Sequence, residues 1–507
     1  LKSNTVIVAV IDSGIDTLHE DLKPILWTNP KEIPGNGIDD DKNGYTDDLH
    51  GWNFLGGKDG RNVKQDSYEG ARVYHRFKKI YGGQQVDSTK LSAEEKAQYN
   101  MWLKSKERIE GDASSNGDEV DMVQMKRALD GTIIADSILC KGLAKDTFTG
   151  NDLEQFIPKT PEEKKAKAAM LYIFKANKLM ESNNRELVEG FKETVEYLEG
   201  EEKKKQAAGQ EPQDYRGEIT KDNEADINDR NYGNSDIMAG TPFHGTHVSG
   251  IIGAARNNGK GIDGIADNVR IMMLRAVPDG DEHDKDIALA IRYAVDNGAR
   301  VVNMSFGKSF SPEKKWVDDA VKYAESKGVL LVHAAGNDAQ NVDSVDNFPN
   351  AVLRTQKSPA SNWITVGASG DPKEGGITAM FSNYGKDQVD VFAPGVKIYS
   401  SVPGGNTYGN AQGTSMASPV VAGTAAFLLS YFPELSVQQL KTAIEKSSVH
   451  PDIKVKKPGS AEEVDLADIS RTGGLLNAFE AAKLAATMKP EKKSEKLPKS
   501  TLKNKKG

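Results

Sequence analysis

Short, nearly all-apolar runs alternate with amphipathic stretches over most of the chain. The first run, Thr5 to Ile11, is rich in β-branched residues, as expected of a strand that is buried on both faces of a parallel sheet. Similar strand-like runs follow in the second half of the chain, and helix-like segments separate the first three of them. These strand-like runs are 269–277, 300–304, 329–334 and 363–368, and the helix-like segments are 286–297 and 312–326. This alternation predicts an α/β fold, a doubly wound parallel sheet with helices on both faces.

The pattern changes between residues 59 and 235. This stretch is rich in Lys, Glu, Gln and Asp, and its apolar residues recur at helical spacing. Ser92 with Glu95, and Thr160 with Glu163, have the spacing of capping boxes at helix starts. The stretch is too long for a plain loop. The sequence therefore predicts a charged helical insertion at 59–235 within one domain, 1–58 and 236–488, followed by a basic, disordered tail at 489–507.

Composition excludes several classes of function. The chain has 507 residues, a formal net charge of −8 and no apolar run that approaches a membrane span. This acidic balance, with scattered basic residues, disfavours nucleic-acid binding. With a single cysteine, Cys140, no intrachain disulfide can form. Because the chain begins with Leu1 and enters a strand almost at once, we interpret it as a processed product, from which a signal or pro-segment could have been removed.

A carboxylate-rich loop follows the first strand. Its oxygen-bearing side chains alternate, a glycine supplies a turn, and further carboxylates follow, which is the spacing of a calcium loop. The twelfth position, where an EF-hand has Glu, is His50, so Asp48 is a candidate substitute. A solvated acidic turn is the alternative. The sequence predicts a structural Ca²⁺ site with candidate ligands Asp39, Asp41, Asn43, Tyr45, Asp47 and Asp48.

An aspartate, a histidine and a serine stand at the ends of predicted elements. Asp12 directly follows the first strand, at the sheet edge where α/β folds place their ligands, although it also suits an Asx turn. His244 begins an apolar helix-like run. Ser415 precedes the helix-like run 420–431, where a serine is most often a cap. A serine nucleophile needs a base such as His, and the base needs an acid to orient it, so these three side chains are candidates for nucleophilic catalysis.

Three segments resemble the signature motifs of the subtilisin-like serine proteases (subtilases, peptidase family S8). They are 10–16 (VIDSGID), 244–250 (HGTHVSG) and 413–419 (GTSMASP), in the order found in that family. The resemblance covers nearly all of the chain outside the insertion and the tail. It implies a serine endopeptidase in which Ser415 attacks, His244 is the base and Asp12 orients it. His247 would be a buried structural neighbour.

The resemblance also implies a substrate cleft. Asn337 matches the oxyanion-hole asparagine of the family, with a plain turn residue as the alternative. Residues 304–307 resemble the strand that pairs with a substrate peptide. Small residues would line the pocket for the P1 side chain. The substrate-binding candidates are Ser305, Phe306, Gly307, Ala335 and Gly336.

The resemblance further implies protein or peptide substrates, no organic cofactor and an extracytoplasmic location. The insertion is the main departure from the family pattern, and it could border the cleft, gate it or bind a partner. Two rival functions stay open. One is a catalytically silent subtilase scaffold that uses the insertion as a binding module, and the other is an amidase or esterase on the same triad.

Overall fold

The computed structural model describes the chain except for residues 1, 113–121, 178, 182, 186, 189–190, 193, 196–197, 201–209, 241, 373–375 and 490–507. The chain forms two compact units, Leu1–Glu69 with Gln213–Gly507, and Gly70–Pro212. The predicted insertion, 59–235, is therefore longer than the smaller unit at both ends. From residue 490 on, the predicted tail lies outside the described residues.

A seven-stranded sheet forms the centre of the larger unit, in the order β2-β3-β1-β4-β5-β6-β7. Neighbouring strands all run parallel. The chain adds strands on one side of β1 and then on the other, so the order reverses at β1, and ligands of α/β sheets bind at the carboxyl end of such a strand. The strands are β1 (Val6–Asp12), β2 (Gly51–Asn53), β3 (Val269–Arg275), β4 (Val301–Met304), β5 (Leu330–Ala334), β6 (Trp363–Ser369) and β7 (Val391–Pro394).

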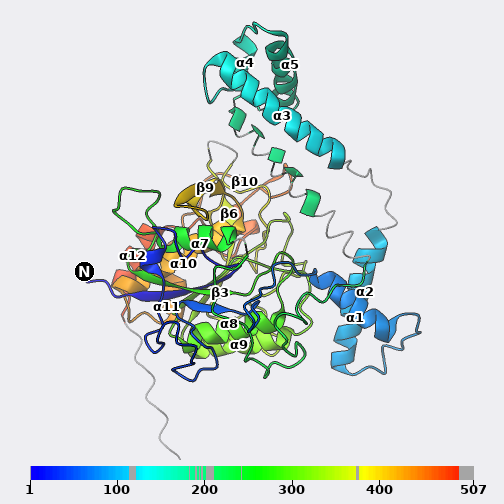
Figure 1. Ribbon diagram of the computed structural model, residues 1–507, viewed down its shortest axis with the longest axis vertical. Helices are drawn as coiled ribbons and strands as arrows, with labels where there is room; N and C mark the ends of the chain where they lie inside the picture. Colours follow the sequence, from blue (N-terminus) through cyan, green and yellow to red (C-terminus); the bar gives the residue numbers. More distant parts are fainter. Residues whose placement is uncertain are drawn as a thin grey trace, which may run out of the picture. The chain divides into compact units, whose positions relative to one another are not determined.

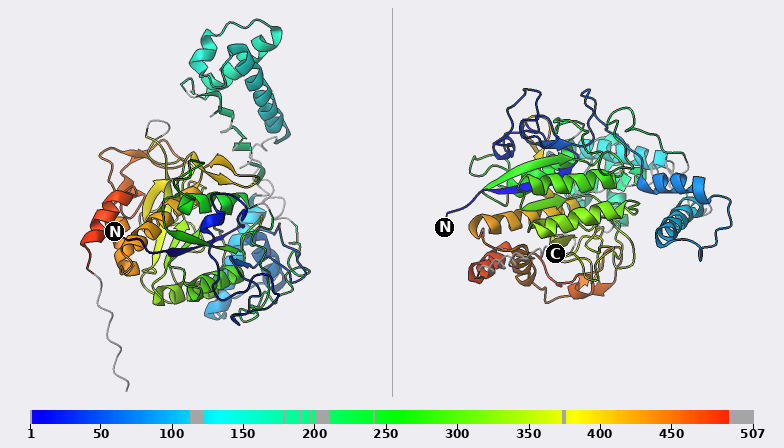
Figure 2. Two further views of the ribbon diagram at one scale, coloured as in Figure 1. Left: turned by 60° about the vertical axis from the view of Figure 1, so that its left-hand side comes forward. Right: turned by 90° about the horizontal axis from the view of Figure 1, so that it is seen from below.

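Helices cover both faces of this sheet (Figures 1 and 2). Successive side chains of a strand point to opposite faces. Val8 and Val10 accordingly pack in one core with α7, α10, α11 and α12, whereas Ala9 and Ile11 pack in the other with α8 and α9. The prediction of a doubly wound α/β fold is confirmed. The helices are α7 (Phe243–Gly253), α8 (Asp284–Asp296), α9 (Lys314–Ser326), α10 (Thr414–Tyr431), α11 (Val437–Lys446) and α12 (Ala478–Thr487).

Smaller elements complete the larger unit. The antiparallel pair β8 (Ile398–Val402) and β9 (Thr407–Ala411) forms one ribbon, and β10 (Val455–Lys456) pairs with β11 (Glu463–Val464). Two 3-10 turns, Lys23–Ile25 and Leu466–Asp468, lie in connecting segments.

The smaller unit is helical in its described part. The predicted capping boxes are present, because Ser92 and Glu95 exchange hydrogen bonds, as do Thr160 and Glu163. Apolar side chains of α3 and α5, among them Leu139 and Phe174, form a core of their own. The helices are α1 (Glu69–Tyr81), which begins at the last residue of the larger unit, α2 (Ala93–Asp112), α3 (Met122–Leu143), α4 (Gly150–Gln155) and α5 (Pro161–Ala176). Within the described part of the chain, no helix combines the length and the apolar character needed to cross a membrane.

Candidate active site

Asp12 and His244 meet at the carboxyl end of β1. Asp12 is the last residue of the strand and is almost fully buried. His244 lies in the first turn of α7, and its Nδ1 is 2.8 and 2.9 Å from the two carboxylate oxygens of Asp12. The next residue, Gly245, allows this approach, since a Cβ atom there would lie 2.1 Å from the carbonyl oxygen of Gly14. The close packing of α7 on β1 therefore depends on a glycine within the histidine motif.

This contact sets the tautomer and the basicity of His244. Nδ1 donates its proton to Asp12, which leaves Nε2 of the neutral ring as a proton acceptor. Burial disfavours the imidazolium form, but the charge of Asp12 and its hydrogen bond outweigh that effect and raise the pKa of His244 above its ordinary value. The ring is therefore a stronger base than a free histidine.

Ser415 lies in the first turn of α10 and does not cap it. The helix begins after Gly413, whose φ of 145° favours glycine. The Ser415 hydroxyl donates to the carbonyl oxygen of Ser305 at 3.2 Å. Pro419 lies four residues further on and lacks the N–H that would bond to the Ser415 carbonyl. The Ser305 hydroxyl donates to that carbonyl instead, at 2.9 Å, which ties the start of α10 to the segment after β4.

The side chain of Asn337 is anchored by its oxygen. Asn337 follows β5. Its Oδ1 accepts two hydrogen bonds from Thr414, one from the backbone N–H at 2.8 Å and one from the side-chain hydroxyl at 2.9 Å. These bonds fix the amide beside the residue that precedes Ser415. No described residue accepts a hydrogen bond from Nδ2, and Asn337 is exposed. An amide held in this way can donate to an anion that forms next to Ser415.

The predicted substrate strand follows β4. Ser305 is buried, whereas Gly307 is exposed and can meet a ligand. The carbonyl oxygen of Phe306 accepts a hydrogen bond from Nε2 of His333 at 2.8 Å. Burial lowers the pKa of His333 to about 4, with this bond opposing the shift, so the ring is a neutral donor at neutral pH. His333 thus holds the strand from behind and is not a catalytic base.

Two asparagines that no sequence pattern indicated shape the predicted P1 pocket. Asn347 and Asn383 each donate from Nδ2 to the carbonyl oxygen of Ala335 at 2.9 Å. A Cβ atom on Gly307 would lie 2.7 Å from Oδ1 of Asn347, and one on Gly336 would lie 2.3 Å from Nδ2 of Asn383. Both glycines of the predicted pocket therefore make room for an asparagine side chain. Asn347 lies in a loop with no helical or strand period, and Asn383 is far from every motif.

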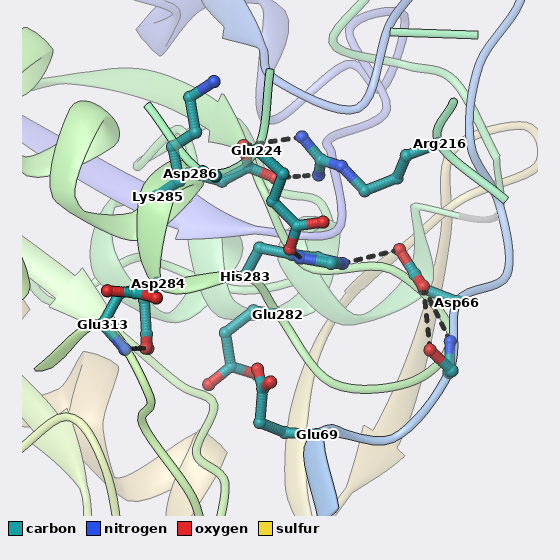
Figure 3. Close-up of polar contacts among 12 residues, drawn as sticks. Asp66, Glu69, Arg216, Glu224, Glu282, His283, Asp284, Lys285, Asp286 and Glu313 are labelled. Atoms are coloured by element: carbon teal, nitrogen blue, oxygen red, sulfur yellow. Dashed lines mark hydrogen bonds and ion pairs between the residues drawn. The ribbon is translucent and has the colours of Figure 1, made fainter. Parts of the chain in front are cut away.

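A network of buried charges lies at the start of α8 (Figure 3). The ring of His283 lies between two carboxylates, Asp66 at 2.9 Å from Nε2 and Glu224 at Nδ1. The guanidinium of Arg216 pairs with Asp286, and both side chains are almost fully buried. Asp66 lies before the smaller unit in sequence, and Arg216 and Glu224 lie after it. Asp66 and Arg216, which flank the smaller unit in sequence, thus make buried polar contacts with the start of α8.

Lys308 joins the end of the substrate strand to this network. Its buried ammonium donates to Glu69 and to the carbonyl oxygen of Glu282, both at 2.7 Å, and lies 3.0 Å from the carboxylate of Asp284. Glu69 is the last residue of the larger unit before the smaller unit begins at Gly70. The strand that would receive a peptide is therefore connected directly to Glu69, the residue at which the chain leaves the larger unit.

Some candidate ligands of the predicted calcium loop cluster together, whereas others are engaged in hydrogen bonds within the loop. Asp39 and Asp41 lie together with Glu32, and one carboxylate oxygen of each is within 4.8 Å of the other two. The oxygens of Asp47 instead accept backbone N–H groups of residues 36 and 37, at 3.2 and 2.9 Å. The amide oxygen of Asn43 accepts the N–H of Tyr45 at 2.7 Å. The backbone carbonyl is the group through which Tyr45 would bind an ion.

Asp48 occupies a position behind the loop. It accepts hydrogen bonds from the amides of Asn29 and Asn43, each at 2.9 Å, and from the hydroxyl of Tyr293 at 2.5 Å. Burial raises the pKa of Asp48 to about 6, although these hydrogen bonds oppose the shift. Both of its oxygens are thus engaged by protein donors, as expected of a residue that braces a loop.

The chain belongs to the subtilase family, because the profile of that family (Peptidase S8) matches residues 3–479. It is 45% identical to the thermophilic serine proteinase of Bacillus sp. (strain AK1) over 190 residues, 37% of this chain and 42% of that protein. It is 37% identical to subtilisin DY of Bacillus licheniformis over 209 residues, 41% of this chain and 70% of that protein. It is 38% identical to thermitase of Thermoactinomyces vulgaris over 206 residues, 40% of this chain and 67% of that protein. The match thus spans less than half of the first of these relatives.

Proposed function

We propose that the chain is a serine endopeptidase that hydrolyses peptide bonds of proteins through an acyl-enzyme intermediate. The observation that carries the proposal is the contact of His244 with Asp12 at the carboxyl end of β1, which orients a base of raised pKa. Ser415 lies in the first turn of α10, a helix that packs against α7. Membership of the subtilase family supports the same class of reaction.

The reaction needs only groups of this chain and water. Ser415 Oγ attacks the scissile carbonyl carbon while its proton passes to Nε2 of His244. The oxyanion accepts hydrogen bonds from Nδ2 of Asn337 and from the N–H of Ser415. The C–N bond then breaks, and His244 gives the proton to the leaving amine. Water, deprotonated by His244, then attacks the acyl carbon. The C–Oγ bond breaks, the carboxylic acid leaves, and His244 returns the proton to Ser415 Oγ.

The substrate peptide would pair with residues 305–307 as an added strand. Its P1 side chain would enter the pocket lined by Gly307, Ala335 and Gly336. Extracytoplasmic protein or peptide substrates are proposed by analogy with the family. Because Lys308 connects this strand to Glu69, the insertion has a route by which to influence which peptides bind.

Asn337→Leu is expected to lower kcat by about 10²–10³-fold with little change in KM, a magnitude that comes from subtilisin itself. The reason is that the amide donates to the oxyanion and not to the bound peptide. Steady-state kinetics on a peptide amide measure both constants. Asn341→Leu, in the loop beyond, is the control and should leave kcat near the wild-type value. A loss that appears in KM alone would assign Asn337 to substrate binding.

We further propose that the carboxylate-rich loop binds Ca²⁺ as a structural ion, with Asp39 and Asp41 as ligands. The support is their proximity and the oxygen donors that a hard cation prefers. Chelation with EDTA is expected to lower the melting temperature, because the bound ion stabilises only the folded chain. At low temperature, labelling of Ser415 by a fluorophosphonate should keep its rate. An unchanged melting curve in EDTA would contradict the calcium proposal.

Cleavage of a diverse peptide library tests the proposed function. A serine endopeptidase should cut internal peptide bonds of the library and of casein. An esterase would hydrolyse simple esters and spare both substrates, and a silent scaffold would leave all of them intact. The same profiling on a chain that lacks residues 70–212 shows whether the smaller unit changes the preferred sequences.

A further inference from the structure

Three carboxylates converge beside the loop, and one of them lies outside the loop itself. Glu32 precedes the loop, whereas Asp39 and Asp41 belong to it, and one oxygen of each lies within 4.8 Å of the other two. Glu32 and Asp41 are largely buried. Carboxylates so close together repel one another unless a cation or a proton joins them. The charge of this cluster thus calls for a counter-ion.

The protein supplies little of that counter-charge. The ammonium of Lys31 lies 3.7 Å from Asp41, but the lysine side chain is 66% exposed. Because solvent surrounds the ammonium, this pair contributes little to the free energy of folding. Backbone N–H groups of residues 43 and 44 also donate to Asp39 and Asp41, but these are neutral dipoles. Most of the negative charge therefore stays uncompensated by the described residues.

Glu32 carries the decisive observation. Its side chain is only 7% exposed, and Oε1 accepts the backbone N–H groups of Asp40 and Asp41 at 3.0 and 3.2 Å. These two bonds fix the orientation of the carboxylate. The other oxygen, Oε2, is buried and accepts no hydrogen bond from any described residue. A buried carboxylate oxygen without a partner is costly, so an unpartnered oxygen on a residue of this carboxylate cluster points to a ligand.

We propose that Glu32 binds the cation of this loop directly through Oε2. The inference rests on the proposed calcium site and adds a ligand to it. It also accounts for His50 at the twelfth position, because His50 binds the carbonyl oxygen of Trp27 instead. Glu32, from outside the loop, supplies the carboxylate that the end of the loop does not. Since Oε1 already accepts two N–H groups, Glu32 binds the ion through one oxygen.

The consequence for the fold is a closed loop. The segment before Glu32 joins strand β3, because the N–H of Trp27 donates to the carbonyl oxygen of Ile271 at 2.8 Å. The segment after the loop continues into β2, where Gly51 pairs with Met273. An ion held by Glu32 and by the loop would join these two neighbouring attachments to the sheet.

Calcium titration by calorimetry on the full chain tests the inference, with Ser415→Ala present to prevent self-cleavage. Glu32→Gln keeps an oxygen for the two N–H groups and removes the charge. We therefore expect the Ca²⁺ affinity to fall by about tenfold or more. Asp40→Asn is the matched control. Asp40 lies in the same loop, and its carboxylate accepts the N–H of Ile33 at 3.0 Å and the amide of Asn36 at 2.9 Å. It lies outside the three-oxygen cluster, and its variant should bind Ca²⁺ within about twofold of the unaltered loop.

Two further readouts separate a ligand from a structural side chain. In excess EGTA, the protein with Glu32→Gln should have a melting temperature equal to or higher than that of the protein with Glu32, because repulsion among three carboxylates is relieved. A purely structural Glu32 would give a lower melting temperature there. With Eu³⁺ as probe, luminescence lifetimes in H₂O and D₂O should report about one additional bound water in Glu32→Gln.

The outcomes distinguish the two proposals. If the unaltered loop binds no Ca²⁺, the calcium proposal fails, and this inference fails with it. If the unaltered loop binds Ca²⁺ and Glu32→Gln binds it equally well with no added water, the assignment of Glu32 alone is overturned. Equal losses in Glu32→Gln and Asp40→Asn would also overturn it, since they would show an effect of loop charge only.

Discussion

Ser415→Ala and His244→Ala are each expected to lower kcat on a peptide amide by about 10⁶-fold, a magnitude measured in subtilisin itself. Ser415 would form the covalent bond, and His244 would carry the proton in both halves of the reaction. Because the two groups act as one unit, the double variant should be no slower than either single variant. Single-turnover and steady-state kinetics on one chromogenic peptide measure all three.

Ser418→Ala is the matched control for this prediction. Ser418 lies in the same helix, is buried, and donates to Oδ1 of Asn303 at 2.8 Å. Its loss should change the melting temperature more than kcat, because it braces the helix and faces no substrate. Activity of Ser415→Ala within about a hundredfold of the wild-type value would be inconsistent with a serine nucleophile.

Asp12→Asn is expected to lower kcat by about 10⁴-fold, as in another Ser-His-Asp triad. The asparagine amide would donate to His244 Nδ1 and so favour the tautomer with its proton on Nε2. The variant should also change the pH profile. Only the neutral base can accept a proton, so activity rises with pH through the pKa of His244, which Asp12 holds above the ordinary 6.5.

The acid limb of the pH profile gives the sign of this effect. In the wild-type chain the midpoint of kcat/KM should lie above pH 6.5, because the neighbouring carboxylate raises the pKa of His244. Without that charge, burial alone acts and the midpoint should move to lower pH. A midpoint that is identical in both proteins would show that Asp12 does not control the basicity of His244.

The residues proposed for catalysis stand in the clearest sequence patterns of this chain. Asp12, His244 and Ser415 each stand in a run of small and apolar residues whose pattern fixes an element end. The structure places Asp12 and His244 in contact across 232 positions of sequence. The parallel sheet was also predictable, because buried strands have continuous apolar runs. Several elements were not predicted. Among them are the short strands β2 and β7, since three or four residues show no clear period.

Residues that support the site could not be predicted, because only the fold brings them together. Ser305 bonds to the carbonyl that Pro419 leaves free, and nothing in either segment indicates the other. Asn347, Asn383 and Glu32 are single polar residues in irregular segments. Their roles depend on which backbone groups lie nearby, and that information is absent from local sequence.

The bounds of the insertion show a second physical limit. Residues 59–69 and 213–235 are as polar as the helices between them, so composition assigned them to the same segment. Yet both Arg216 and Asp66 are buried in the larger unit, where Arg216 pairs with Asp286 and Asp66 contacts the ring of His283. Polar composition predicts exposure only when the charged groups stay unpaired.

The most direct test of the central claim is fluorophosphonate labelling of the calcium-loaded chain, followed by mass-spectrometric location of the label and a parallel casein assay. The proposed function predicts that the label is on Ser415, that His244→Ala and Ser415→Ala prevent it, and that casein is cleaved only by the unlabelled wild-type chain. No label on Ser415 together with intact casein would contradict the assignment of a serine endopeptidase.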